Sequence, residues 1–150
     1  MFSLSQQPLE QINLKDGLAA PEAGGFVCFE GLVRNHNEGK EVVALEYEAF
    51  PELAQKEADK IFAEAKVKFD INQAKCVHRI GKLNIGEMAV WVGATATHRD
   101  AAFAVCRFII DEIKTRLPIW KKEYYASGDS GWVNCQACSH PVAPQLIDHE

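Results

Sequence analysis

The chain lacks any apolar run long enough to cross a membrane and any segment that resembles a secretion signal. No apolar run approaches the roughly 20 residues that a membrane-spanning helix needs. The N-terminal residues 1–7 lack the basic region and the long apolar stretch with which a secretion signal begins. We therefore expect a cytoplasmic protein that is not embedded in a membrane.

The sequence also lacks an excess of positive charge and an even set of cysteines. Lys and Arg number 16 against 21 Asp and Glu, a formal net charge of −5, whereas a nucleic-acid-binding domain is usually basic. The five cysteines are odd in number and mostly lie in apolar patterns, so they do not form a disulfide framework in that compartment. These shortages argue against a nucleic-acid binder and against a disulfide-stabilised domain.

What remains is the composition of an ordinary globular protein. The 150 residues are 47% apolar and 25% charged, which predicts a single domain spanning 1–150 with a sizeable core. From about residue 139 the chain has two prolines and few core residues, so we expect a mobile tail there.

Hydrophobic periodicity predicts an α+β fold, with two main helices packed on mostly antiparallel strands. Apolar residues at three- and four-residue spacing predict helices over 51–66 and 98–117, and weakly over 9–18. In one predicted strand, alternation places Val43, Leu45, Tyr47 and Ala49 on one face. The predicted strands cover 2–5, 26–33, 42–50, a stretch within 71–83, 88–95, 119–126 and 132–133.

Four cationic side chains fall within the nine residues from Lys114 to Lys122, and Pro118 interrupts them. Because proline cannot continue a helix, Lys114 is expected on the last helical turn and Lys121 on the next, extended segment. Two ammonium groups from two elements can converge on one anion, and clustered cations on an acidic chain favour a local anion pocket. The alternative is structural, since cations and a following proline are common at helix C-termini.

A second cationic group lies at the predicted start of the same helix. Thr97-His98-Arg99-Asp100 fits a capping box with Thr97 as the N-cap, which places His98 and Arg99 where the helix dipole favours anions. Acidic residues would suit stability better, so an anion-binding role is favoured over two solvent-facing side chains. Arg34 is a third candidate, because it stands where a predicted strand gives way to a Gly- and Asn-containing loop.

The remaining histidines and cysteines do not predict a metal or redox site. His36, His78 and His140 have no partners at metal-ligand spacing, and we interpret them as structural or exposed. Cys135 and Cys138 form a lone C-x-x-C without the second half-site that structural zinc requires. We expect no metal and no resident cofactor.

Three motifs together resemble the large, catalytic subunit of molybdopterin synthase. They are Gly31–Arg34, Thr97–Arg99 and Lys114–Glu123, and the third, K-T-R-x-P-x-W-K-[KR]-E, is the most specific. The similarity extends from the first glycine pair to Trp132. The resemblance implies an α/β hammerhead with an additional α+β portion.

The resemblance also implies an activity and partners. The family converts cyclic pyranopterin monophosphate (precursor Z) into molybdopterin by installing two dithiolene sulfurs. The sulfur arrives as a thiocarboxylate on the C-terminal Gly-Gly of a small ubiquitin-like partner, whose tail enters the pocket of the large subunit. The assembly is a heterotetramer, with a central dimer of large subunits and one small subunit at each end.

Site residues follow from the matching motifs. Arg34, His98 and Arg99 match positions that hold the pterin phosphate, and Lys114 and Lys121 match the two active-site lysines. Lys114 is expected to stabilise the charge that develops at the thiocarboxylate, and Lys121 to orient substrate or assist proton transfer. The expected substrate-binding set is completed by Leu32, Val33, Lys122 and Glu123.

The sequence departs from the family pattern at one place, and two alternative functions remain open. Family members can carry a basic residue shortly after the Trp-Val pair, reaching into the neighbouring subunit's site, but here Trp132-Val133 is followed by Asn134-Cys135-Gln136. A non-catalytic scaffold that docks a ubiquitin-like tail or an anionic metabolite would need the cationic pocket without depending on one lysine. A thiol-based sulfur carrier would place the chemistry on Cys135 or Cys138.

Overall fold

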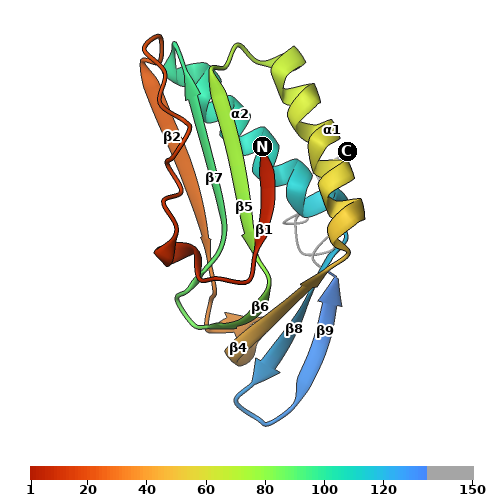
Figure 1. The fold of residues 1–150 in the computed structure, drawn as a ribbon. Helices are drawn as coiled ribbons and strands as arrows, with labels where there is room; N and C mark the ends of the chain where they lie inside the picture. The colour runs from red at the N-terminus through yellow and green to blue at the C-terminus, as the bar shows by residue number, and fades with distance from the viewer. Residues whose placement is uncertain (135–150) are drawn as a thin grey trace, which may run out of the picture.

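Two sheets and two long helices make up the fold of the computed structural model, which describes residues 1–134 (Figure 1). Cys135, Cys138, His140 and the predicted tail lie outside the described residues. No helix in the described part is long and apolar enough to cross a membrane. The elements in chain order are β1 (Phe2–Ser5), η1 (Leu9–Gln11), β2 (Gly25–Leu32), β3 (His36–Asn37), β4 (Lys40–Ala49), α1 (Pro51–Lys68), β5 (Gln73–Arg79), β6 (Gly81–Asn84), β7 (Met88–Ala96), α2 (Arg99–Arg116), β8 (Ile119–Tyr125) and β9 (Ser130–Asn134).

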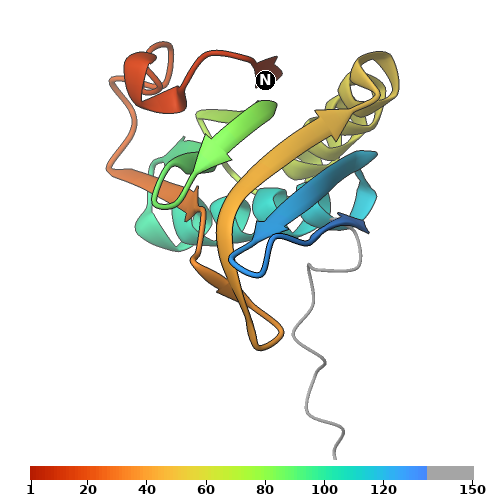
Figure 2. The same cartoon turned by 90° about the horizontal axis from the view of Figure 1, so that it is seen from below.

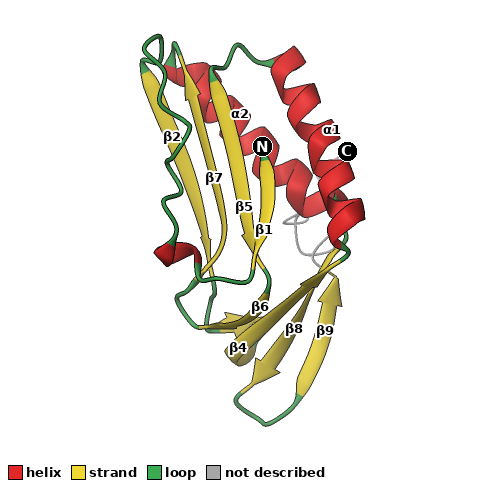
Figure 3. Cartoon of the chain, in the orientation of Figure 1, coloured by secondary structure: helices red, strands yellow, loops and turns green. Residues whose placement is uncertain are grey.

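The first sheet has the strand order β1-β5-β7-β2, with β1 parallel to β5 and the other pairs antiparallel. Both helices lie on one side of this sheet (Figure 3) and share one core with Cys76, Val92 and Ala94. The N-terminal segment covers the other side, where Leu9 and Leu18 pack around Trp91. Every residue of β7 is buried because both of its faces are covered, which explains its uninterrupted apolar sequence.

The second sheet is built on β4, which pairs with β3, β6 and β8, while β9 pairs with β8. Seen from below, β4 runs from the hairpin with β3 at one end to the start of α1 at the other (Figure 2). The segment predicted as strand within 71–83 serves both sheets, since β5 belongs to the first and β6 to the second. The chain changes sheets at Gly81, whose φ of +94° is readily adopted only by glycine.

The α+β class is confirmed, and the helices lie within two residues of their predicted bounds. Over 9–18 only one 3-10 turn forms, because the apolar side chains of this segment pack individually onto the sheet. The capping box is wrong: β7 continues to Ala96, and His98, with φ −122° and ψ 145°, is the N-cap and makes no side-chain cap hydrogen bond. Val43 is 47% exposed because a register shift between Val42 and Ala44 interrupts the alternation.

Candidate active site

Pro118 separates the two predicted lysines onto different elements, as expected. Helix α2 ends at Arg116, and Leu117 is extended at φ −79° and ψ 137°, the conformation favoured before proline. Strand β8 begins at Ile119. Lys114 therefore lies on the last turn of α2, and Lys121 lies on a strand of the second sheet.

A cleft of about 740 Å³ brings these lysines together with the end of β2. Arg34, just after β2, Lys114 from α2 and Lys121 from β8 all line this cleft. Leu32 and Glu123 line it as well, so five of the nine predicted site residues share one cavity. Three separate elements thus bring cationic residues to a common space, the arrangement that an anionic ligand requires.

The floor of the cleft is the inward face of the β4–β8 pair. Tyr47 lies directly opposite Lys121 in the antiparallel register, and Leu45 lies directly opposite Glu123. Opposed residues of antiparallel strands direct their side chains to the same face. Lys114 reaches the same floor from α2, with its Nζ 6.0 Å from the centroid of the Tyr47 ring.

Glu123 is a buried carboxylate that ties the hairpin after Arg34 to this floor. Glu123 is only 2% exposed. Its Oε1 atom accepts hydrogen bonds from Asn37 Nδ2 at 2.8 Å and from the Tyr125 hydroxyl at 3.2 Å. Burial, followed by the negative charge of Glu123, raises the pKa of Tyr125. Because Asn37 lies on β3, its bond to Glu123 restrains the short loop that begins at Arg34.

Two predicted site residues next to these positions lie outside the cleft. Val33 is 3% exposed and belongs to the core, where its backbone pairs with Gly86 and Glu87. Lys122 lies on the opposite face of β8 from Lys121, because side chains alternate along a strand. Its Nζ lies 5.3 Å from the Tyr124 ring centroid and 5.7 Å from that of Trp132.

His98 and Arg99 lie at the opposite end of α2 from the cleft. Fifteen residues separate Arg99 from Lys114, which corresponds to about 22 Å along a helix axis. The start of β2 confirms this placement, since a Cβ atom added to Gly25 would lie 3.3 Å from Arg99 Cα. Within one chain, the pair at the helix start and the two lysines cannot contact the same anion.

Two of the described thiols, Cys106 in the cleft wall and Cys76 in the core, do not offer a nucleophile at neutral pH. Burial, followed by the nearby Cys28, raises the pKa of Cys106, which lines the cleft, to about 11. Burial raises the pKa of Cys76 to about 12. Since the thiolate is the reactive form, both groups are inert at neutral pH. Among residues 1–134, no three His, Cys, Asp or Glu side chains gather to hold a metal ion.

Several residues of the cleft were absent from the predicted set. Arg107, Asp111 and Lys114 are spaced by four and three residues, so helical periodicity could have placed all three on one face of α2. Asn37 and Glu123 are 86 residues apart, and no local pattern predicts their hydrogen bond. The other lining residues that sequence reasoning did not select include Phe29, His36, Tyr47, Phe103 and Ile110.

The chain is similar to known proteins over most of its length. A family model described as "MoaE protein" matches residues 4–116. The molybdopterin synthase catalytic subunit of Thermoplasma volcanium is 39% identical over 129 residues, which cover 86% of this chain and 94% of that protein. The subunit of the same name from Pseudomonas aeruginosa is 43% identical over 122 residues, covering 81% of this chain and 80% of that protein.

A solved structure shares the fold. The crystal structure of molybdopterin synthase from Staphylococcus aureus superposes with a TM-score of 0.82 at 32% sequence identity, covering 88% of this chain and 96% of that chain. The family model, the two relatives and this structure each match most of the length of the chain. The chain therefore belongs to the family of molybdopterin synthase catalytic subunits.

Proposed function

We propose that this chain is the catalytic half of a two-protein sulfurtransferase and that its chemistry takes place in the cleft between α2, β2, β4 and β8. It transfers sulfur from the C-terminal thiocarboxylate of a small ubiquitin-like partner to precursor Z, forming the dithiolene of molybdopterin. The observation that carries this proposal is the convergence of Arg34, Lys114 and Lys121 from three elements on one cavity. A thiocarboxylate and a cyclic phosphate are both anions, and fixed positive charge is what brings two anions together.

The two lysines have different surroundings, which supports a division of roles. Lys114 stabilises the negative charge that develops on the carbonyl oxygen of the thiocarboxylate end during acyl transfer, because it reaches the cleft floor from α2, with its Nζ 6.0 Å from the centroid of the Tyr47 ring. Lys121 orients precursor Z or assists proton transfer from its place on the floor, in the register opposite Tyr47. Lys122, on the outer face of β8, is left out of the substrate-binding set.

The apolar part of the cleft suits the tail of the partner. Phe29 and Leu32 contribute from β2 and Phe103 from α2, and their exposed fractions are 42%, 54% and 61%. An extended Gly-Gly tail has no side chains to exclude, so it fits between these apolar side chains with its terminal thiocarboxylate directed to the lysines.

His98 and Arg99 are assigned to the cleft of a second copy of the chain. They lie about 22 Å along α2 from Lys114, so a role in holding the pterin phosphate requires the other protomer of the predicted central dimer. We place the reaction in the cytoplasm, since the described cysteines Cys28, Cys76 and Cys106 are free thiols, as is usual in a reducing compartment.

Reconstitution tests the function and its key residue together. The purified chain is mixed with precursor Z and a partner that carries a C-terminal thiocarboxylate, and the dithiolene product is measured after oxidation to its fluorescent derivative. We expect product from the wild type and a loss of about 100-fold or more in Lys114→Ala, as when an electrostatic stabiliser of a transition state is removed. Lys122→Ala is the matched control, because it removes a lysine of the same run from the outer face.

Three outcomes separate the alternatives. Full activity in Lys114→Ala would refute the assigned role of that lysine. An equal loss in Lys122→Ala would show that the net charge of the run matters, rather than the lysine in the cleft. Absence of product from the wild type, with the partner demonstrably bound, would favour a non-catalytic scaffold.

A further inference from the structure

Tyr47 is a neighbour of both lysines of the cleft. It is 5% exposed and lines the cavity, and its Cα is paired with that of Lys121 across the β4–β8 register. The Nζ of Lys114 lies 6.0 Å from the centroid of its ring, at the outer range of a cation–π contact. One aromatic ring therefore lies near the ammonium that arrives from α2, and it belongs to a residue that is the strand neighbour of Lys121 on β8.

A buried histidine holds this ring from the first sheet. His78 on β5 is 1% exposed, and its ring lies edge-on to that of Tyr47, with centroids 5.0 Å apart and an interplanar angle of 77°. Its Nδ1 donates a hydrogen bond of 2.7 Å to the carbonyl oxygen of Arg79, which fixes the orientation of the imidazole. Burial, followed by the Lys114 ammonium, lowers the pKa of His78 to about 3, so the imidazole is neutral and does not repel Lys114.

We propose that Tyr47 is a positioning residue for sulfur transfer: its ring fixes the Lys114 ammonium beside Lys121, and the edge-on contact with His78 fixes the ring. Lysine has a flexible four-carbon stem, so a catalytic ammonium needs such a surface to hold one orientation. The inference rests on the proposed function for its effect on activity. Its structural content, the environment of the Lys114 amine, can be measured without substrate.

The outer face of the same sheet offers a matched control. There the Tyr124 ring lies 5.3 Å from the Nζ of Lys122 and 5.3 Å from the Nζ of Lys82. This is the same pairing of a tyrosine ring with lysines in the same sheet, but none of these three residues lines the cleft. A general effect of removing a tyrosine from the sheet would therefore show in Tyr124→Leu as well.

The experiment combines lysine reactivity with kinetics in Tyr47→Leu, Tyr47→Met, Tyr47→Phe and Tyr124→Leu. The rates at which Lys114 and Lys122 are acylated by a pulse of an N-hydroxysuccinimide ester are read from their peptides by mass spectrometry. Because the ring favours the protonated, immobilised amine, Leu or Met at position 47 is expected to raise the rate at Lys114 about three- to tenfold and to leave Lys122 unchanged. Phe retains the ring and is expected to stay within about twofold of the wild type.

In the reconstituted reaction, Tyr47→Leu is expected to lower kcat about tenfold while KM for precursor Z changes less than about twofold, because orientation is lost rather than binding. Tyr124→Leu is expected to change neither the kinetics nor the labelling of Lys114. Thermal unfolding of each variant identifies the folded ones, and Tyr47→Met, which fills space without a ring, replaces Tyr47→Leu if that variant does not fold.

Unchanged labelling of Lys114 in the folded Leu or Met variant would overturn the proposal. So would a change in Tyr47→Phe as large as that in Tyr47→Leu, since the hydroxyl and not the ring would then be the important group. If the wild type makes no product, the proposed function fails, while the labelling still decides whether Tyr47 positions Lys114.

Discussion

His78 makes the stability of the protein depend on pH through a single side chain. Burial, followed by the Lys114 ammonium, lowers its pKa from 6.5 to about 3. Between these values the unfolded chain binds a proton that the folded chain excludes, so the free energy of unfolding decreases as the pH falls. This group alone contributes a slope of up to about 1.4 kcal/mol per pH unit below pH 6. Its stabilising contribution is fully present above about pH 6.5.

Replacing this side chain should flatten the acid response. His78→Phe keeps an aromatic ring against Tyr47 but cannot bind a proton. Between pH 6 and pH 4, the slope of its free energy of unfolding against pH is therefore expected to be smaller than that of the wild type by about 1.4 kcal/mol per pH unit. Urea unfolding at several pH values measures both slopes. The variant loses the hydrogen bond to Arg79, so it is expected to be less stable at pH 7, and only the slopes are compared. Parallel pH dependences in the two proteins would contradict the prediction.

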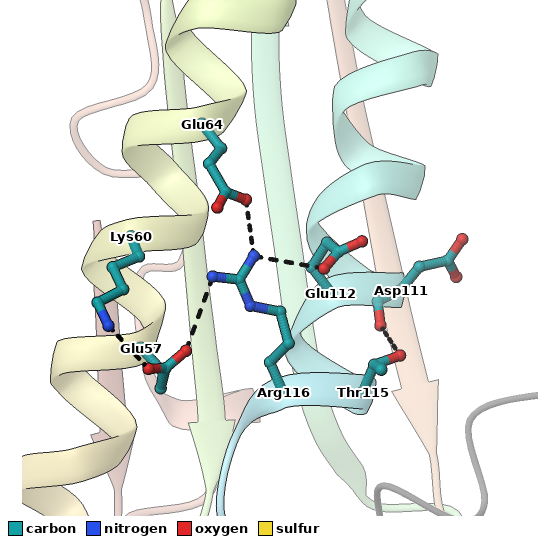
Figure 4. A network of polar contacts seen from close by, with 7 residues as sticks. All are labelled: Glu57, Lys60, Glu64, Asp111, Glu112, Thr115 and Arg116. Carbon is teal, nitrogen blue, oxygen red and sulfur yellow. Dashed lines mark hydrogen bonds and ion pairs between the residues drawn. The ribbon is translucent and has the colours of Figure 1, made fainter.

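At the scale of elements, one arginine joins the end of α2 to α1. The Nη1 atom of Arg116 lies 2.6 Å from Glu64 Oε2 and 3.4 Å from Glu112 Oε2, and its Nη2 atom lies 3.7 Å from Glu57 Oε2 (Figure 4). The hydrogen bond with Glu64 raises the pKa of Arg116 and lowers that of Glu64. Because Arg116 follows Lys114 by two residues, this contact holds the last turn of α2, which presents the lysine that we propose as catalytic.

Arg116→Gln is therefore expected to lower the Tm by about 2–5 °C at low salt and by less in 1 M NaCl, because screening already weakens the ion pairs. Arg107→Gln is the control: its ion pair with Asp111 lies within α2, and the two side chains are 79% and 47% exposed. That variant should change the Tm by less than about 1 °C. Differential scanning calorimetry at both salt concentrations measures the effect. A salt-independent decrease in Arg116→Gln would show that packing, rather than charge, joins the helices.

The sequence predicts the positions of the helices and strands better than it predicts which of their side chains face the cleft, the core or solvent. Pro118 and the apolar spacing of α2 correctly predict that Lys114 and Lys121 lie on different elements, because both signals are local. Strand alternation also predicts that Lys122 faces outward once Lys121 faces inward. The exposure of Val43 could not be predicted from the sequence, because it depends on a register shift that only the pairing of β4 with β8 creates. Long-range pairing likewise decides how Asn37 meets Glu123.

At the scale of the whole molecule, the separation of the cationic groups along α2 predicts a shared active site. Arg34, Lys114 and Lys121 line one cleft, whereas His98 and Arg99 lie about 22 Å along the helix from Lys114. If all five act on the same substrate, His98 and Arg99 must come from the neighbouring protomer of a dimer. No cation follows closely after Trp132-Val133, where family members can carry the basic residue that reaches into the neighbouring site. We therefore assign His98 and Arg99 as the cationic residues that the neighbouring protomer contributes.

Mixed dimers test this arrangement directly. Lys114→Ala and Arg99→Ala homodimers are each expected to lose most of their activity, since every cleft lacks one essential cation. When the two variants are co-expressed with different tags and the mixed dimer is purified, one cleft lacks both cations and the other is intact. The mixed dimer is therefore expected to recover about half of the wild-type activity. If Arg99 acts within its own chain, both clefts remain defective and the mixed dimer stays as inactive as the homodimers. A chain that is monomeric by light scattering at assay concentration would equally refute the shared site.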